Sequence, residues 1–346
     1  MSERAPNADF TKLVSGAHVH LMGICGTAMG SLAGLLVDRG FRVTGSDQNV
    51  YPPMSTQLER LGIRIYEGYK RENLNPKPDL VVVGNVISRG FDEAQALLES
   101  DIPFTSLPRA MGEFLIADRH SVVVAGTHGK TTTTSLVAWI LDQAGLNPGF
   151  LIGGIPKNFA QSYRVPKGDW FVIEGDEYDT AFFDKVPKFT HYRPRSAILT
   201  GVEFDHADIY RDLEHVKQAF LMLLKSIPNN GRLIASAEDE NVADCLHRQP
   251  VANLITFGLS SGDYQARELN ENALSTAFDV ICAGKLVTRL ETSMIGSYNV
   301  KNALAAFALA EALGVPVEKT VQAMRTFAGV KRRQEIIGRP NGITLI

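Results

Sequence analysis

The residues best suited to chemistry form a short loop between an apolar run and a helical stretch. The apolar run ends in three valines at 122–124, and the loop consists of Gly126, Thr127, His128, Gly129, Lys130, Thr131 and Thr132. Glycines let backbone N–H groups approach phosphate oxygens, and a helix N-terminus adds partial positive charge. Lys130 can reach the outer phosphates of a nucleotide, and the Thr131 hydroxyl can bind magnesium. We therefore predict that this loop binds ATP.

The loop departs from the general phosphate-loop pattern at one position. That pattern requires a glycine at the start of the loop, and Val124 and Ala125 stand where it is expected. The alternative is a strand-to-helix turn with a solvated lysine. The context favours the phosphate loop, because residues 131–144 carry apolar side chains at helical spacing and Gly145 follows as a C-cap.

Two further groups of polar residues follow apolar runs that we expect to be buried strands. Glu174 comes directly after the run 170–173 and is the best candidate for a magnesium ligand; the alternative is a solvated acidic turn. His206 lies among acids at 203–208, after the run 197–199, and could supply a second metal ligand or a base. Because ligands bind at the carboxyl edge of a parallel sheet, we expect Lys130, Thr131, Glu174 and His206 to converge there.

The N-terminal part has the layout of a dinucleotide fold. A strand at 18–22, a glycine-rich turn, a helix at 31–39 and a second strand at 41–44 are followed by Asp47. The glycines are Gly23, Gly26 and Gly30, which is not the strict G-x-G-x-x-G spacing, so the turn does not indicate NAD. The alternative role for these glycines is packing of the helix on the strand.

Length and composition limit the possible classes of protein. A chain of 346 residues exceeds what one core usually serves, so we expect at least two domains. The net charge of −3 argues against a nucleic-acid partner, and no apolar run is long enough for a membrane helix. Three cysteines without metal-like spacing, and an N-terminus without a signal-peptide core, predict a cytoplasmic protein.

The remaining pattern places the domain boundaries. We expect the first domain to end at residue 117 and a second α/β domain to follow, with strands at 233–235, 254–257, 278–282 and 286–290 and helices at 212–226, 300–313 and 317–327. Residues 283–284 are typical of a hairpin turn. The chain ends at 342–346, which resembles the start of another strand.

Four strings together resemble the Mur ligase family, which are ATP-dependent amide-bond ligases of peptidoglycan precursors. They are Gly-Thr-His-Gly-Lys-Thr-Thr at 126–132, Glu-Gly-Asp-Glu-Tyr-Asp at 174–179, Glu-Phe-Asp-His-Ala-Asp at 203–208 and Gly-Ser-Tyr-Asn-Val-Lys-Asn-Ala at 296–303. The resemblance implies an α/β protein with a Rossmann-like N-terminal domain at 1–117 and a central P-loop ATPase domain at 118–330 with an added antiparallel β region. Residues 331–346 would be a hinge and the first strand of a third, Rossmann-like domain that is otherwise absent.

The resemblance also implies roles for individual residues. A UDP-sugar would bind near Gly23, Gly26, Thr27, Ser46, Asp47 and Asn85. ATP would contact the loop 126–132, with Asn299 and Asn302 near the adenine and Arg332 at the hinge. Magnesium ions would be held by Thr131, Glu174 and His206, and the catalytic residues would be Lys130, Glu174 and His206.

The strings 49–56, 179–185 and 203–208 further resemble the branch of the family that uses a recycled murein tripeptide. This implies that UDP-N-acetylmuramate is joined to L-alanyl-γ-D-glutamyl-meso-diaminopimelate through an acyl phosphate. Without the third domain, we expect the chain to bind ligands but not to ligate at a useful rate. The alternatives are an alanine ligase of the same family, a dehydrogenase built on the first glycine-rich turn, and a non-catalytic UDP-sugar-binding module.

Overall fold

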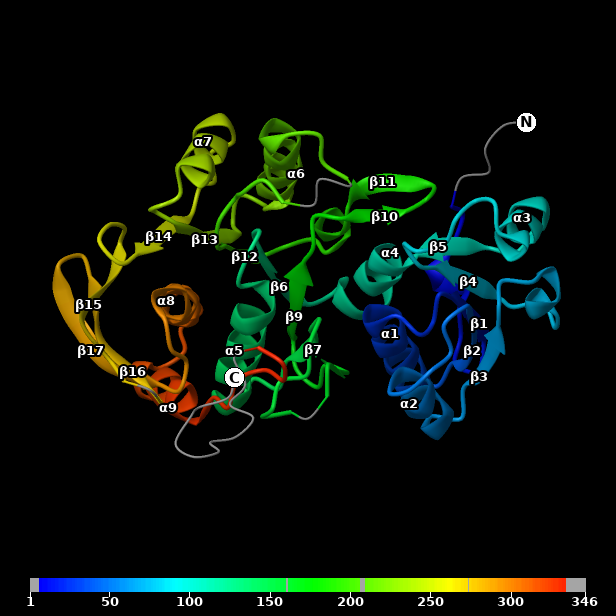
Figure 1. The fold of residues 1–346 in the computed structure, drawn as a ribbon, viewed down its shortest axis with the longest axis horizontal. Helices are drawn as coiled ribbons and strands as arrows, with labels where there is room; N and C mark the ends of the chain where they lie inside the picture. Colours follow the sequence, from blue (N-terminus) through cyan, green and yellow to red (C-terminus); the bar gives the residue numbers. More distant parts are fainter. Residues whose placement is uncertain (1–5, 160, 206–208, 273, 334–346) are drawn as a thin grey trace, which may run out of the picture. The chain divides into compact units, whose positions relative to one another are not determined.

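The computed structural model describes residues 6–159, 161–205, 209–272 and 274–333, which form two compact units (Figure 1). The first unit contains the chain up to Asp118 together with Tyr178–Tyr192. The second contains Arg119–Glu177 and the chain from Arg193 onward. The boundary that the sequence predicts at residue 117 remains a prediction, and the excursion at Tyr178–Tyr192 adds a segment that the sequence pattern does not reveal.

The first unit is built on a five-stranded parallel sheet in the order β3-β2-β1-β4-β5. Its strands are β1 (His18–Met22), β2 (Arg42–Asp47), β3 (Arg64–Glu67), β4 (Leu80–Val83) and β5 (Phe104–Ser106). β1 and β4 are buried along their whole length because helices cover both faces of the sheet. The strand order reverses between β1 and β4, where ligands bind in sheets of this type.

Helices and short helical turns cover the two faces of this sheet. They are η1 (Phe10–Lys12), α1 (Thr27–Asp38), α2 (Met54–Arg60), η2 (Arg71–Leu74), α3 (Asp92–Glu99), α4 (Leu107–Met111) and η3 (Gly112–Ile116). α1, α2 and α4 lie on one face, and α3 and η2 lie on the other (Figure 1).

The segment Tyr178–Tyr192 packs on the first unit through aromatic side chains. It consists of a hairpin of β10 (Asp179–Ala181) and β11 (Asp184–Pro187), followed by η4 (Lys188–His191). The ring of Phe183 contacts that of Phe104 edge-on, with 5.1 Å between centroids, and Arg89 lies 5.8 Å above the ring of Phe182. These contacts bury large apolar surface, which holds the hairpin on this unit.

The second unit contains a ten-stranded sheet in the order β17-β16-β15-β14-β13-β12-β6-β9-β7-β8. Its strands are β6 (His120–Ala125), β7 (Gly149–Leu151), β8 (Tyr163–Arg164), β9 (Trp170–Gly175), β12 (Ser196–Leu199), β13 (Arg232–Ser236), β14 (Leu254–Gly258), β15 (Tyr264–Glu271), β16 (Thr276–Cys282) and β17 (Lys285–Thr292). The strands from β14 to β7 are parallel, whereas β15, β16 and β17 pair in antiparallel fashion.

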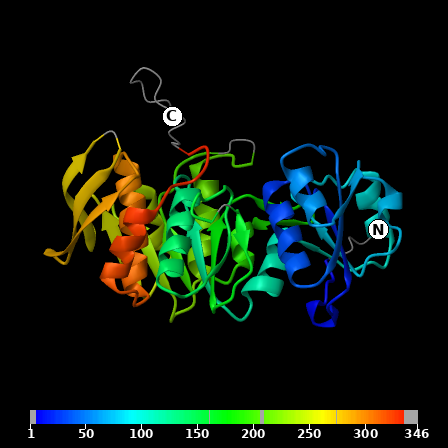
Figure 2. The same ribbon diagram turned by 90° about the horizontal axis from the view of Figure 1, so that it is seen from below.

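Three helices bury the main core against one face of this sheet. They are α5 (Lys130–Gln143), α8 (Ser297–Ala312) and α9 (Val317–Thr326), and Figure 2 shows them side by side. α6 (Leu213–Ser226) and α7 (Glu240–Arg248) lie on the opposite face (Figure 1). In the part of the chain that the structure describes, no helix is sufficiently long and apolar to cross a bilayer.

The predicted α/β architecture with an added antiparallel region is confirmed. Several boundaries near the candidate sites differ from the predictions. β2 continues to Asp47 rather than ending at residue 44, and α8 begins at Ser297 rather than at residue 300. α1 begins at Thr27, so the helix starts directly after Gly26 rather than at residue 31. β9 continues through Glu174 to Gly175, because both residues keep pairing with β6. The strand predicted at 342–346 lies outside the described residues.

Protonation of two histidines is expected to lower the free energy of unfolding as the pH falls. Burial lowers the pKa of His18 to about 4, assisted by Arg42, and burial lowers that of His120 to about 4, assisted by Arg232 and Arg195. A group whose pKa is lower in the folded state stabilises the fold above its unfolded pKa, near 6.5, and this stability is lost as the pH falls toward 4. For the buried His18 the contribution is at most roughly 3 kcal/mol.

The free energy of unfolding, measured by urea titration between pH 7.5 and 4, should therefore fall with pH. The variant His18→Asn should show a shallower fall, and His247→Asn, which changes an exposed histidine, should match the parent protein. A slope that His18→Asn leaves unchanged would contradict this origin of the pH dependence.

Candidate active site

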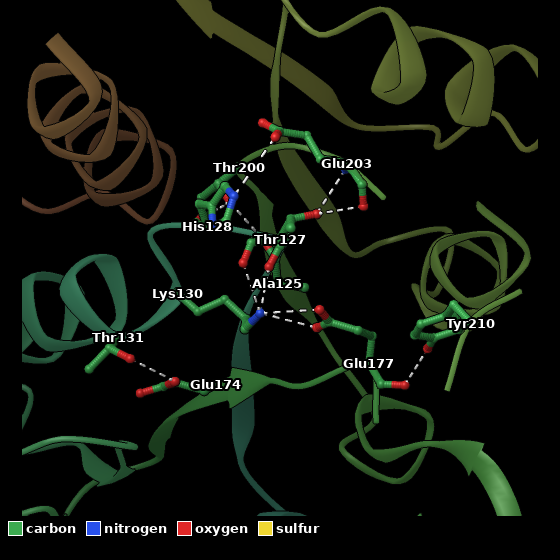
Figure 3. A network of polar contacts seen from close by, with 11 residues as sticks. Ala125, Thr127, His128, Lys130, Thr131, Glu174, Glu177, Thr200, Glu203 and Tyr210 are labelled. Atoms are coloured by element: carbon green, nitrogen blue, oxygen red, sulfur yellow. Dashed lines mark hydrogen bonds and ion pairs between the residues drawn. The ribbon is translucent and has the colours of Figure 1, made fainter. Parts of the chain in front are cut away.

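The phosphate loop connects the carboxyl end of β6 to the start of α5 (Figure 3). Gly129 is the N-cap residue of α5 and adopts a left-handed conformation with φ of 83°. No side chain caps this helix, so its first-turn N–H groups face the loop without a side-chain acceptor. A positively polarised helix end of this kind is suited to a phosphate group.

Lys130 is turned toward Glu177 rather than Glu174, as Figure 3 shows. Its ammonium lies 3.1 Å from Glu177 Oε2 and donates to the carbonyl oxygens of Gly126, at 2.8 Å, and Thr127, at 3.2 Å. The side chains of Lys130 and Glu177 are only 15% and 3% exposed. Burial raises the pKa of the Glu177 carboxyl, and the Lys130 charge opposes that rise.

Glu174 joins the phosphate loop to a glycine pair after β7. Its Oε2 accepts a hydrogen bond from the Thr131 hydroxyl at 3.1 Å, and its Oε1 accepts from the Gly153 N–H at 2.6 Å. Burial raises the pKa of this carboxyl, whereas these two hydrogen bonds and Lys130 act in the opposite direction. The structure thus brings together a carboxylate and a hydroxyl, which are hard oxygen ligands of the kind that magnesium prefers.

The loop is also bonded to the segment that follows β12. The Thr127 hydroxyl accepts from the Glu203 N–H at 2.8 Å, and the Thr200 hydroxyl donates to the His128 carbonyl at 2.6 Å. The imidazole of His128 is largely exposed and lies 3.8 Å from the Glu203 carboxylate. These contacts hold the phosphate loop against the start of the segment that contains His206. His206 itself lies outside the described residues, so its role as a metal ligand or base remains a prediction.

The two asparagines of α8 lie beside the loop. Asn302 contacts Gly129, and its amide donates to Asn299 Oδ1 at 3.3 Å, while Asn299 donates to the Ile295 carbonyl at 2.9 Å. Both are buried, and their predicted contact with adenine remains a prediction.

Gly129→Ala is expected to weaken nucleotide binding. A Cβ atom there would lie 2.5 Å from Asn302 Oδ1, and the left-handed backbone would cost roughly 1–2 kcal/mol in addition. The clash forces the loop or Asn302 to move, which displaces the N–H groups that would face a bound phosphate. Calorimetric titration with ADP should show at least about tenfold weaker binding, equivalent to about 1.4 kcal/mol.

Gly145→Ala is the matched control at the other end of the same helix. Gly145 has φ of 85°, and a Cβ atom there would have no neighbour within 4 Å. This variant should therefore lose a similar amount of stability through backbone strain but retain nucleotide affinity. Equal affinity losses in both variants would rule out a specific role for the contact with Asn302.

Arg332 lies just beyond a short contact between two distant segments. Lys331 N–H donates to the Ile155 carbonyl at 3.0 Å, and Val330 and Thr131 both contact Gly154. Arg332 is exposed and has a positive φ of 60°. The role in ATP binding that the family resemblance implies for Arg332 remains a prediction. No cluster of three or more metal-ligating acids, histidines or cysteines occurs in the described ranges, which exclude His206.

The predicted UDP-sugar residues surround the exposed start of α1. Asp47 accepts the Cys25 N–H at 2.8 Å and the Asn49 N–H at 3.0 Å, which fixes the turn ahead of the helix. The Ser46 carbonyl accepts the Gly23 N–H at 2.8 Å, and Ser46 itself is fully buried. The N–H groups of this turn are therefore already hydrogen-bonded within the protein. The uncapped first turn of α1 remains as the candidate pyrophosphate site.

The other predicted residues of this site are exposed. Gly26 and Thr27 lie at the start of α1, and Asn85 lies beyond the end of β4, the strand beside β1. This is the edge where the strand order reverses, although contact with a UDP-sugar remains a prediction for all six residues.

Comparison with known proteins decides the family. Residues 18–119 match the model of the Mur ligase family, catalytic domain, and residues 124–310 match that of the Mur ligase middle domain. The chain belongs to the Mur ligase family. Members of this family are ATP-dependent ligases that form C–N bonds and generally use magnesium. The family predicted from the sequence is therefore confirmed.

Two curated Mur ligases illustrate how this chain relates to individual members. The UDP-N-acetylmuramate–L-alanyl-gamma-D-glutamyl-meso-2,6-diaminoheptandioate ligase of Escherichia coli is 44% identical over 94% of this chain and 71% of its own length. A UDP-N-acetylmuramate–L-alanine ligase of Clostridium tetani is 34% identical over 98% of this chain and 72% of its own length.

A solved structure of another Mur ligase is also similar to this chain. The crystal structure of UDP-N-acetylmuramate:L-alanyl-gamma-D-glutamyl-meso-diaminopimelate ligase from Neisseria meningitides matches this Mur ligase with a TM-score of 0.87 and 43% identity. The match covers 92% of this chain and 100% of that one.

Three contacts of the site were not predicted. The sequence pattern indicates Glu174 within an acidic run but does not identify Glu177 as the partner of Lys130. It also missed the Gly153 N–H that binds Glu174, and Tyr210, whose hydroxyl donates to the Glu177 carbonyl at 2.5 Å. The glycine pair at 153–154 is the signal that could have indicated a close backbone approach.

Proposed function

We propose that this Mur ligase joins UDP-N-acetylmuramate to the tripeptide L-alanyl-γ-D-glutamyl-meso-diaminopimelate at the expense of ATP, in peptidoglycan recycling. The observation that supports the class of reaction is the phosphate loop with a largely buried lysine on one side and a carboxylate–hydroxyl pair on the other. The observation that supports the tripeptide as the substrate is a difference in sequence identity between this chain and two groups of relatives. It is 42–44% to two ligases named for this tripeptide and 32–35% to ligases named for alanine.

The residues of the second unit would activate the muramate carboxylate. An oxygen of that carboxylate attacks the γ-phosphorus of ATP, the bond between this phosphorus and the β–γ bridging oxygen breaks, and ADP leaves. Both reactants are anions, so the Lys130 ammonium would reduce their repulsion and hold the outer phosphates. The first-turn N–H groups of α5 would bind phosphate oxygens in the same way.

Magnesium fits the oxygen donors that this unit provides. Glu174 and Thr131 would hold it, with His206 as a further candidate ligand. Magnesium bound there would neutralise phosphate charge and orient the polyphosphate.

The second half of the reaction would form the amide bond. The α-amine of the tripeptide attacks the carbonyl carbon of the acyl phosphate, the amine loses a proton, and inorganic phosphate leaves. Exclusion of water would protect the acyl phosphate from hydrolysis. The first unit would contribute the UDP-sugar site at the start of α1, with Gly26 and Thr27 nearest the pyrophosphate.

An assay with both amine substrates tests the proposal. The enzyme, purified at its full natural length, is given ATP, magnesium and UDP-N-acetylmuramate with either the tripeptide or L-alanine, and phosphate release and product mass are measured. We expect phosphate release coupled to formation of the tripeptide adduct. Faster turnover with L-alanine would instead assign the alanine ligase activity. UDP-N-acetylmuramate binding without any phosphate release would assign a non-catalytic sugar-binding module.

A further inference from the structure

The Lys130 ammonium has three N–H donors, and three groups of the protein accept from them. These are the Gly126 carbonyl, the Thr127 carbonyl and the Glu177 carboxylate. A lysine that contacts the outer phosphates of ATP must therefore exchange at least one of these acceptors for a phosphate oxygen.

The cost of losing each acceptor decides which one is exchanged. The two carbonyls are neutral, whereas Glu177 is an anion whose side chain is 3% exposed. Separating a buried carboxylate from a cation costs several times more than losing a neutral hydrogen bond. Lys130 is thus expected to release the carbonyls of Gly126 and Thr127 and to keep its ion pair with Glu177.

The backbone of Glu177 is also fixed by a hydrogen bond. The hydroxyl of Tyr210, which is 5% exposed, donates to the Glu177 carbonyl at 2.5 Å, and the Tyr210 ring contacts that of His215 edge-on. Figure 3 shows Tyr210 on the side of Glu177 that lies away from Lys130. The chain Tyr210–Glu177–Lys130 therefore connects the segment after β12 to the phosphate loop.

We propose that Glu177 is a positioning residue that remains paired with Lys130 while this lysine exchanges loop carbonyls for phosphate oxygens. This inference rests on the proposed ATP-dependent activity. The pair has two opposite consequences. The Glu177 charge reduces the attraction of the loop for a polyphosphate, and the same contact fixes the ammonium where charge develops during phosphoryl transfer.

The variant Glu177→Gln separates these consequences, because glutamine keeps an oxygen acceptor but removes the charge. The dissociation constant of ADP without magnesium is measured by calorimetry, and kcat is measured separately by phosphate release. We expect ADP to bind about tenfold more tightly, because one negative charge is removed beside the loop. We expect kcat to fall about tenfold, because the remaining neutral hydrogen bond holds Lys130 less firmly.

Glu291→Gln is the charge-matched control, since Glu291 is exposed on β17 and loses the same single charge. It should leave both quantities unchanged. Unchanged or weaker ADP binding by folded Glu177→Gln would overturn the inference. If the parent protein binds no nucleotide at all, the proposed function fails first, so the two failures are distinguishable.

Tyr210→Phe provides a second test that keeps all charges. It removes only the hydroxyl that donates to the Glu177 carbonyl. We expect a kcat several-fold below that of the parent protein with the ADP dissociation constant unchanged. If Glu177→Gln does not fold, Tyr210→Phe serves as the test of the inference. An unchanged kcat in Tyr210→Phe overturns it.

Discussion

Lys130→Met is expected to lower kcat about a thousandfold, the loss typical of removing a preorganised charge from a transition state. The methionine side chain has a similar length but cannot neutralise charge between the muramate carboxylate and the γ-phosphate. Tripeptide-dependent phosphate release measures the effect. Activity within about tenfold of the parent enzyme would contradict the role of Lys130 in phosphoryl transfer.

The same substitution is expected to destabilise the second unit. It removes the cation that pairs with the Glu177 carboxylate, which is 3% exposed, and removing one member of a buried pair costs about 3–5 kcal/mol. The double variant Lys130→Met/Glu177→Gln removes both charges, so urea titration should show most of the lost stability restored. Its activity should remain as low as that of the single variant. Restored activity would show that Lys130 serves stability alone.

Glu174→Gln is expected to lower kcat by about two to three orders of magnitude and to raise the magnesium concentration needed for half-maximal activity. Glutamine presents one oxygen and one NH2 group, so it can no longer accept from both the Thr131 hydroxyl and the Gly153 N–H. It also lacks the negative charge that binds a divalent cation. Titration of activity with magnesium, together with ATP binding at several magnesium concentrations, measures both effects.

Asp179→Asn is the control within the same acidic run. Asp179 pairs with Lys185 at 2.8 Å on the hairpin of the first unit, and its side chain is 40% exposed. Its replacement should leave the magnesium dependence unchanged. A magnesium dependence that Glu174→Gln does not alter would remove Glu174 from the proposed metal site.

Much of the phosphate loop could be predicted from neighbouring residues. The valines before Gly126 and the helical spacing after Lys130 predict a strand, a turn and a helix, and β6 and α5 occupy these positions. The pair Thr131–Glu174 follows from topology, since β6 and β9 are adjacent parallel strands whose carboxyl ends meet at one edge.

The sequence pattern does not show which of the nearby acids contacts Thr131 and which contacts Lys130. Glu174 lies near the end of β9 and Glu177 lies two residues beyond it, yet one accepts from Thr131 and Gly153 and the other pairs with Lys130. Which carboxylate faces the lysine depends on the path of the backbone after β9. That path is held by Tyr210, which is 33 residues away in sequence.

The sequence by itself determined the α/β class, the family and the strand–loop–helix unit around Lys130, because these depend on local periodicity, turn residues and short strings. Only the tertiary structure decided that Glu177 is the partner of Lys130 and that Tyr178–Tyr192 packs with the first unit. Both depend on contacts between residues far apart in the chain. The burial of Phe183 against Phe104 and the pairing of two buried charges gain their free energy only when the fold brings these groups together.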